Sequence, residues 1–160
     1  MSLATISRIF DIHHRALAVN LDGITDEAAL IEPHPGGNCI NWIVGHILIS
    51  RDAILGLLGQ KPIFQNNRTA QYKRGAKVAD VGKLVPLSEL IEALDASQKK
   101  LMTALEKLPE AEANKPVEPA GSAPKTALID QLTFLQFHEA YHIGQVGLLR
   151  RIVGKEGAIP

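Results

Sequence analysis

Four long segments in which apolar residues recur at helical spacing constrain the fold of this 160-residue chain more than any other feature. Apolar positions three and four residues apart fall on one face of a helix, which then packs against other helices. Period-two alternation bounded by turn residues, the pattern of a β-strand, occurs nowhere, so we expect no strand. The sequence therefore predicts an all-α four-helix bundle formed by residues 2–22, 38–58 or 41–58, 88–108 and 126–153.

Side-chain caps and two long connections mark the limits of these helices. Asn38 or Asn41 would cap the second helix, and Thr126 the fourth. Residues 60–86 form a polar and basic connection after the second helix, and residues 109–124 form a Pro-rich connection after the third. Connections of such length are unusual in a compact domain, so we expect residues 60–86 to be a functional loop or a crossover.

The composition excludes several classes of function. Lys plus Arg and Asp plus Glu both number 17, so the formal net charge is zero, which argues against charge-driven binding to nucleic acid or an anionic membrane. No apolar run approaches the roughly 18 residues that span a bilayer, and the N-terminus carries no secretory segment. A single cysteine, Cys39, excludes an intrachain disulfide and fits a reducing cytoplasm. We therefore expect one cytoplasmic domain over residues 1–160, without nucleic acid or membrane partners.

Two histidines, His138 and His142, lie four residues apart in the last helical segment. Residues at this spacing differ by about 40° around a helix, so both imidazoles leave the same face. Phe134 and Leu149 share that face, which places the pair within an apolar stripe that we expect to face the bundle core. Buried polar groups need partners, so the pair either binds a transition-metal ion or forms hydrogen bonds to core neighbours. We favour the metal ion.

A third metal ligand is expected from another helix. His46 lies with Trp42 in an apolar stripe of the second helix, and on its own it would be a hydrogen-bonded core histidine. Together with the pair it makes a three-histidine site, whose remaining positions are open as in catalytic zinc centres. His13, on the apolar side of the first helix, is the rival ligand. His34, between two prolines, is interpreted as a loop residue, and Cys39 as a buried small side chain or a residue lining the pocket.

The letters from His138 to His142 also spell the H-E-x-x-H motif of zinc metalloproteases. The extended form of that motif continues with a glycine and a third histidine, but Gln145 and Leu148 occupy those positions. No strand is predicted that would pair with an extended peptide substrate. We therefore exclude a zincin protease.

The run from His138 to Gln145, followed by Leu148-Leu149-Arg150-Arg151, resembles the C-terminal signature of the DinB-like superfamily. The segment from Asn41 to His46 is similar to the W-x-x-x-H segment of that family, and the resemblance covers essentially the whole chain. It implies a four-helix bundle, often dimeric, in which three histidines hold a divalent metal ion. The matching residues are His46, His138 and His142. Some relatives are S-transferases or isomerases that use a low-molecular-weight thiol, and many have no assigned activity.

The main hypothesis is a metal-dependent enzyme, of hydrolase or thiol-dependent transferase type, that acts on a small molecule. Imidazole ligands suit zinc, nickel or iron, and a bound ion lowers the pKa of water or of a thiol, or polarises a carbonyl group. The thiol cosubstrate and the homodimer rest on the resemblance alone. The alternative is a noncatalytic dimeric interaction module whose metal site is structural or vestigial.

Four residues near the histidines have roles that the sequence leaves open. Glu139 would act as a base, or form hydrogen bonds at the rim of the site or in an interface. Tyr141 would donate a hydrogen bond into the pocket, or serve as a core or interface aromatic. Gln145 would position a ligand or a metal-bound water, or hold a metal ligand in place, and Trp42 would line the pocket. The basic residues of the first long connection would cover the pocket, contact an anionic substrate or remain solvated; they are Arg68, Lys73, Arg74 and Lys77.

Overall fold

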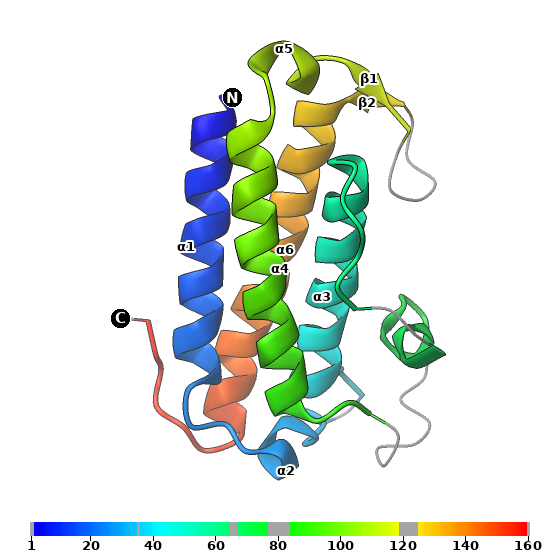
Figure 1. Ribbon diagram of the computed structural model, residues 1–160. Helices are drawn as coiled ribbons and strands as arrows, with labels where there is room; N and C mark the ends of the chain where they lie inside the picture. Colours follow the sequence, from blue (N-terminus) through cyan, green and yellow to red (C-terminus); the bar gives the residue numbers. More distant parts are fainter. Residues whose placement is uncertain (1, 35, 65–66, 77–83, 119–124, 160) are drawn as a thin grey trace.

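Four long helices dominate the computed structural model, which describes residues 2–34, 36–64, 67–76, 84–118 and 125–159 (Figure 1). They are α1 (Leu3–Leu21), α3 (Ile40–Leu57), α4 (Leu87–Lys107) and α6 (Leu128–Ile152). The shorter elements are α2 (Asp26–Ala29), the 3₁₀-helix η1 (Asn67–Tyr72), α5 (Glu110–Ala113) and the strands β1 (Pro116–Val117) and β2 (Thr126–Ala127). The predicted all-α bundle is confirmed.

The long helices follow one another around the bundle in the order α1, α6, α3 and α4, and α4 packs back against α1. α3 and α4 run in the same direction, because the connection between them leads from one end of the bundle to the other (Figure 1). The connection after α3 is therefore a crossover, one of the two forms that its length predicted. η1 lies on this crossover and packs against α3.

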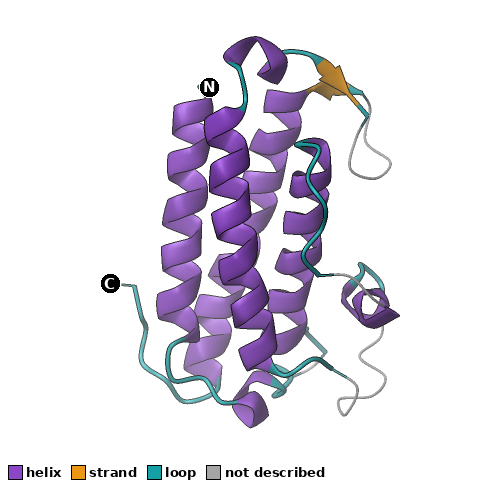
Figure 2. Cartoon of the chain, viewed as in Figure 1, coloured by secondary structure: helices purple, strands orange, loops and turns teal. Residues whose placement is uncertain are grey.

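The helix caps differ from those expected from the sequence. Cys39 is the N-cap of α3 and provides no side-chain hydrogen bond. The Asn41 amide instead donates to the Val85 carbonyl oxygen at 2.8 Å and accepts from the Tyr72 hydroxyl at 3.2 Å. Thr126 does not cap α6 either. It pairs with Val117 in the antiparallel hairpin of β1 and β2, in which each strand has two residues (Figure 2). The prediction of no strand was wrong at this hairpin, which is too short to show alternation.

The apolar core consists of two clusters stacked along the bundle. One cluster contains Leu17, Ile47, Leu94 and Val146, and the other contains Phe10, Ile54, Leu101 and Leu132, so each cluster draws on all four long helices. Between these positions in sequence, each helix carries a polar or charged residue whose side chain contacts another member of the same set. These residues are His13, Arg51, Gln98 and Glu139, and we call them the polar layer.

α3 also has the length and composition of a membrane span, which the sequence reading did not anticipate. Its 18 residues from Ile40 to Leu57 have a mean hydropathy of 1.3. In the bundle, 61% of this window is buried against the other elements. Such burial is what a core helix shows, because α3 packs against α4, α6 and η1.

Candidate metal centre

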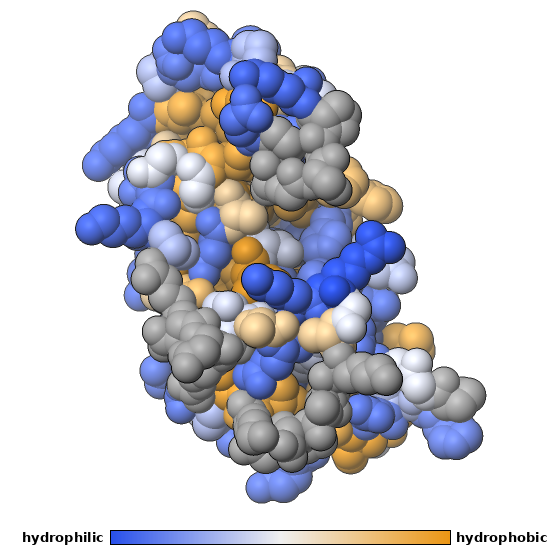
Figure 3. Space-filling view, turned by 90° about the vertical axis from the view of Figure 1, so that its right-hand side faces the viewer, coloured by the Kyte–Doolittle hydropathy of each residue, from blue (hydrophilic) through white to orange (hydrophobic). Residues whose placement is uncertain are grey.

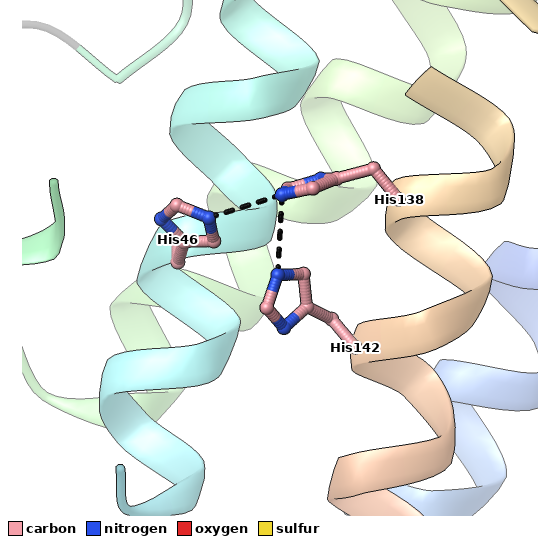
Figure 4. Close-up of side chains that lie close together, drawn as sticks. All are labelled: His46, His138 and His142. Atoms are coloured by element: carbon pink, nitrogen blue, oxygen red, sulfur yellow. Dashed lines mark hydrogen bonds between the residues drawn. The ribbon is translucent and has the colours of Figure 1, made fainter. Parts of the chain in front are cut away.

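Three imidazoles meet between α3 and α6 (Figure 4). His46 Nε2 lies 3.2 Å from His138 Nε2, and His142 Nε2 lies 3.2 Å from the same atom. One nitrogen from each ring lies within 4.8 Å of the others, a separation that allows one ion to contact all three. The structure thus brings together the three residues that the sequence predicted as ligands.

The outer nitrogen of the His46 ring is fixed by the backbone of η1. His46 Nδ1 lies 2.7 Å from the Tyr72 carbonyl oxygen, which only accepts hydrogen bonds, so Nδ1 carries the proton. The Trp42 ring stacks on His46 at 4.9 Å between centroids with an interplanar angle of 9°. Trp42 Nε1 in turn donates to the Gln71 carbonyl oxygen at 2.7 Å. Two successive carbonyl groups of η1 therefore orient the His46 imidazole and the Trp42 ring that stacks on it.

The outer nitrogen of His142 is held by a side chain of its own helix. His142 Nδ1 lies 2.7 Å from Gln145 Oε1, while Gln145 Nε2 donates to the Tyr141 hydroxyl at 3.5 Å. With the amide in this orientation, His142 Nδ1 donates its proton to Gln145. Of its two predicted roles, Gln145 therefore holds a ring nitrogen in place.

The three inner nitrogens share too few protons to satisfy one another. His46 and His142 carry their protons on Nδ1, so both of their Nε2 atoms present lone pairs to His138 Nε2. His138 Nε2 holds at most one proton and can donate it to only one neighbour, while His138 Nδ1 is buried with no hydrogen-bond partner among the described residues. Converging imidazole lone pairs are the donor set of a divalent cation, so the residues present fit such an ion.

Additional protons on His138 or His142 would supply the missing hydrogen-bond donors, but binding them is unfavourable. Burial, together with the neighbouring His142 and His46, lowers the pKa of His138 to about 4. Burial also lowers the pKa of His142, and the hydrogen bond to Gln145 offsets this only in part. His138 and His142 are therefore neutral near pH 7, as metal ligation requires.

A glycine allows η1 to reach the site. Gly45 precedes His46 in α3, and a Cβ atom there would overlap the ring of Tyr72. Tyr72 is fully buried, and its hydroxyl accepts a hydrogen bond from the Val85 backbone nitrogen at 2.9 Å. The sequence reading missed both Gln71 and Tyr72. The only signal was a glycine beside a ligand histidine, which indicates a close approach of another segment.

The basic residues of the crossover lie in different places. Lys73 and Arg74 follow Tyr72 and are exposed. Hydrophilic and apolar surfaces adjoin on the side of the molecule that Figure 3 shows, which is the side on which Figure 1 draws η1. Arg68 belongs to η1, and Lys77 lies outside the described residues.

Glu139 is buried in the core, so the prediction that it lies at the rim of the site was wrong. Its side chain is 1% exposed and pairs with Arg51 of α3. Burial alone would raise the pKa of Glu139, but the charge and hydrogen bonds of Arg51, together with the nearby His13, hold it below its ordinary value. Glu139 is therefore an ionised partner of Arg51. Its neighbour in sequence, His138, points toward the other rings (Figure 4).

Further predicted residues occupy different surroundings. His13, the rival ligand, lies outside the cluster, with Nδ1 3.5 Å from Glu139 Oε1. Tyr141 is 59% exposed and packs edge-on against His142, so it is not a core aromatic. Cys39 is buried and His34 is exposed in a turn, as expected.

The stripe around the histidines is not wholly a core face. Phe134, which was expected to face the core with them, is 58% exposed, whereas Leu149 is buried. α6 carries apolar residues on its outer side as well, so periodicity could not separate its two faces. The histidines lie along the border between them.

Comparison with known proteins agrees with the fold described above. The family model described as the DinB superfamily matches residues 9–146. The fold is similar to the crystal structure of a conserved protein from Enterococcus faecalis, with a TM-score of 0.74 and 19% identity over 96% of this chain and 98% of that one. It is equally similar to a DinB-like protein from Bacillus cereus, with a TM-score of 0.74 and 16% identity over 98% of this chain and 95% of that one. No curated protein matches the sequence. The match over residues 9–146 means that this chain belongs to the DinB superfamily.

Proposed function

We propose that this protein binds one divalent metal ion through His46, His138 and His142 and uses it in a reaction on a small molecule. The observation that carries the proposal is the surplus of lone pairs among the three Nε2 atoms, two of which lie 3.2 Å from the third. Neutral imidazoles suit zinc, nickel and iron.

The chemistry that fits this ligand set is of the hydrolase or thiol-dependent transferase type. A bound ion with open positions lowers the pKa of a water or thiol that it holds. The chain itself contributes orientation: the Tyr72 carbonyl and the Trp42 ring fix His46, and Gln145 fixes His142. The exposed Lys73 and Arg74, which directly follow η1, are the groups we propose for contact with the substrate.

Metal content tests the first half of the proposal. Wild-type protein, a His46→Ala variant and a His34→Ala control are stripped with chelator, reloaded with zinc, nickel or ferrous iron, desalted and measured by elemental analysis. We expect one ion per chain in the wild type and the control, and a loss of stoichiometric binding in His46→Ala. A wild type that retains none of the three metals would refute the site.

Turnover tests the second half. The metal-loaded protein is screened for hydrolysis and for thiol transfer, with and without added low-molecular-weight thiols. We expect activity that disappears in His46→Ala, whereas a metal-loaded protein inactive across the panel favours the noncatalytic module.

The outer face of α6 favours a second copy of this chain as a partner in either case. Phe134, Phe137, Tyr141, Leu148 and Ile152 are all at least 49% exposed and follow one side of the helix. None of them is charged, so a two-fold axis would bring apolar surfaces together without repulsion. Aromatic side chains bury roughly 150–250 Å² each, so the two stripes together approach the roughly 1,000 Å² that a specific interface needs.

A further inference from the structure

The polar layer links all four long helices at a single guanidinium group. Arg51 of α3 is fully buried, and it donates from Nε to Glu139 Oε2 at 2.5 Å and from Nη2 to Glu139 Oε1 at 2.7 Å. Its Nη1 donates to Gln98 Oε1 of α4 at 2.6 Å. The Phe10 ring of α1 lies 5.5 Å from the guanidinium carbon. Arg51 therefore has one partner in each of the other three long helices.

Stability alone does not account for this arrangement. A buried ion pair loses the hydration of two charges, and apolar residues of similar volume often stabilise a core as well or better. The core on either side of the layer is apolar, so the ion pair is an exception within it. The ion pair instead provides a fixed geometry, because two parallel hydrogen bonds hold a guanidinium group and a carboxylate at one distance and one angle.

The ion pair joins the same two helices that carry the imidazoles. Arg51 lies five residues after His46, about 7.5 Å along the axis of α3, and Glu139 directly follows His138 in α6. A slide or rotation of α3 against α6 would separate His46 from the other two rings, and the same movement would break both Arg51–Glu139 hydrogen bonds.

We propose that Arg51 and Glu139 are positioning residues for the three-histidine site, holding α3 and α6 in the register that brings His46 to His138 and His142. This inference rests on the proposed metal site. Neither residue touches the ion in this proposal. Their action passes through the backbones of the two helices, which carry all three ligands.

The test compares three variants with the wild type. Arg51→Met/Glu139→Leu removes the ion pair and leaves no uncompensated buried charge. Arg51→Lys keeps the charge and loses the two-pronged geometry. Gln136→Leu is the matched control: Gln136 is also a buried polar residue of α6, but it donates to the Ile6 carbonyl oxygen of α1 at 2.6 Å and not to α3.

Zinc affinity is measured by chelator competition, ligand geometry by the visible spectrum of the cobalt-loaded protein, and stability by urea unfolding in excess chelator. We expect both Arg51 variants to lose about 10- to 100-fold in zinc affinity and to show an altered cobalt spectrum. Gln136→Leu should keep the wild-type affinity and spectrum even where its stability falls.

A folded Arg51→Met/Glu139→Leu protein with wild-type affinity and spectrum would overturn the inference, as would an equal loss in Gln136→Leu. If the double variant fails to fold, Arg51→Lys decides. Metal-free protein gives an independent readout, because the His46 and His142 ring centroids lie 4.8 Å apart and should give NMR contacts in the wild type that weaken in both Arg51 variants. A wild type that shows these contacts but binds no metal refutes the proposed function. The positioning role is then decided by whether the contacts weaken in the Arg51 variants.

Discussion

At the scale of single residues, the protons on the outer ring nitrogens decide what the inner nitrogens can do. His142 shows this most directly, because Gln145 accepts its Nδ1 proton and leaves Nε2 free to act as a ligand. Hydrogen-bond partners of metal-bound histidines fix the tautomer and raise ligand basicity.

Gln145→Leu should therefore weaken zinc binding by about tenfold with little change in fold, because the partly buried amide mainly serves His142. Chelator competition measures the affinity. Gln131→Leu is the control, since Gln131 lies in the same helix but bonds to Thr126. Equal affinities for the wild type and Gln145→Leu would contradict the assignment.

The depressed pKa of His138 predicts how the metal-free protein responds to acid. The pKa is about 4 in the folded chain against an ordinary histidine value of 6.5, so between these limits the unfolded chain binds more protons. The unfolding free energy should thus fall as the pH drops from 6.5 toward 4. Urea unfolding in chelator at pH 7 and pH 5 measures this loss, which should be smaller in His138→Gln. The same loss in both proteins would show that His138 titrates normally.

At the scale of elements, the docking of η1 on α3 depends on the missing side chain of Gly45. Gly45→Ala would force Tyr72 away, because the new Cβ overlaps its ring. We expect a destabilisation of about 1–3 kcal/mol, typical of overpacking, together with weaker zinc binding, because the Tyr72 carbonyl orients His46.

Gly56→Ala provides the matched control for this change. Gly56 lies in the same helix with nothing within 4 Å of its added Cβ, so alanine should stabilise the chain by up to about 1 kcal/mol. Urea unfolding compares the two. Similar effects of the two substitutions would mean that η1 does not pack on α3 as described.

The sequence predicted the elements better than it predicted their contacts. Apolar spacing with glycine and proline breakers located the four long helices to within a few residues, and helical angles put both His138 and His142 on one face. The caps were wrong because Asn41 has better partners in Val85 and Tyr72, which are distant in the chain.

Contacts between residues that are distant in the sequence also explain why the surroundings of Glu139 and His46 were not predicted. Glu139 could be given an angle from the sequence but not a partner, because Arg51 lies 88 positions away. The role of the Tyr72 carbonyl could not be predicted for a different reason. Every residue has a backbone carbonyl group, so the residue type does not indicate which one accepts the hydrogen bond.

At the scale of the whole molecule, the exposed stripe on α6 bears on assembly. If two copies pair through it, a charge within the stripe should separate them, because a buried unpaired carboxylate is costly. Phe137→Glu, at a residue 69% exposed in the single chain, should shift the protein to a monomer without loss of folding. Sedimentation equilibrium measures the mass, with Ile31→Glu, a substitution at a 49% exposed residue between α2 and α3, as the control. A wild type that is already monomeric would refute the pairing.

The way in which η1 meets the site has a consequence for how such a scaffold can diversify. Gln71 and Tyr72 orient Trp42 and His46 through carbonyl oxygens, which survive any change of side chain. The buried ring of Tyr72 helps to anchor the segment, whereas Lys73 and Arg74 beside it are exposed, so their side chains can vary at little cost in packing. Mutation can then alter what approaches the centre while the groups that build the centre stay the same.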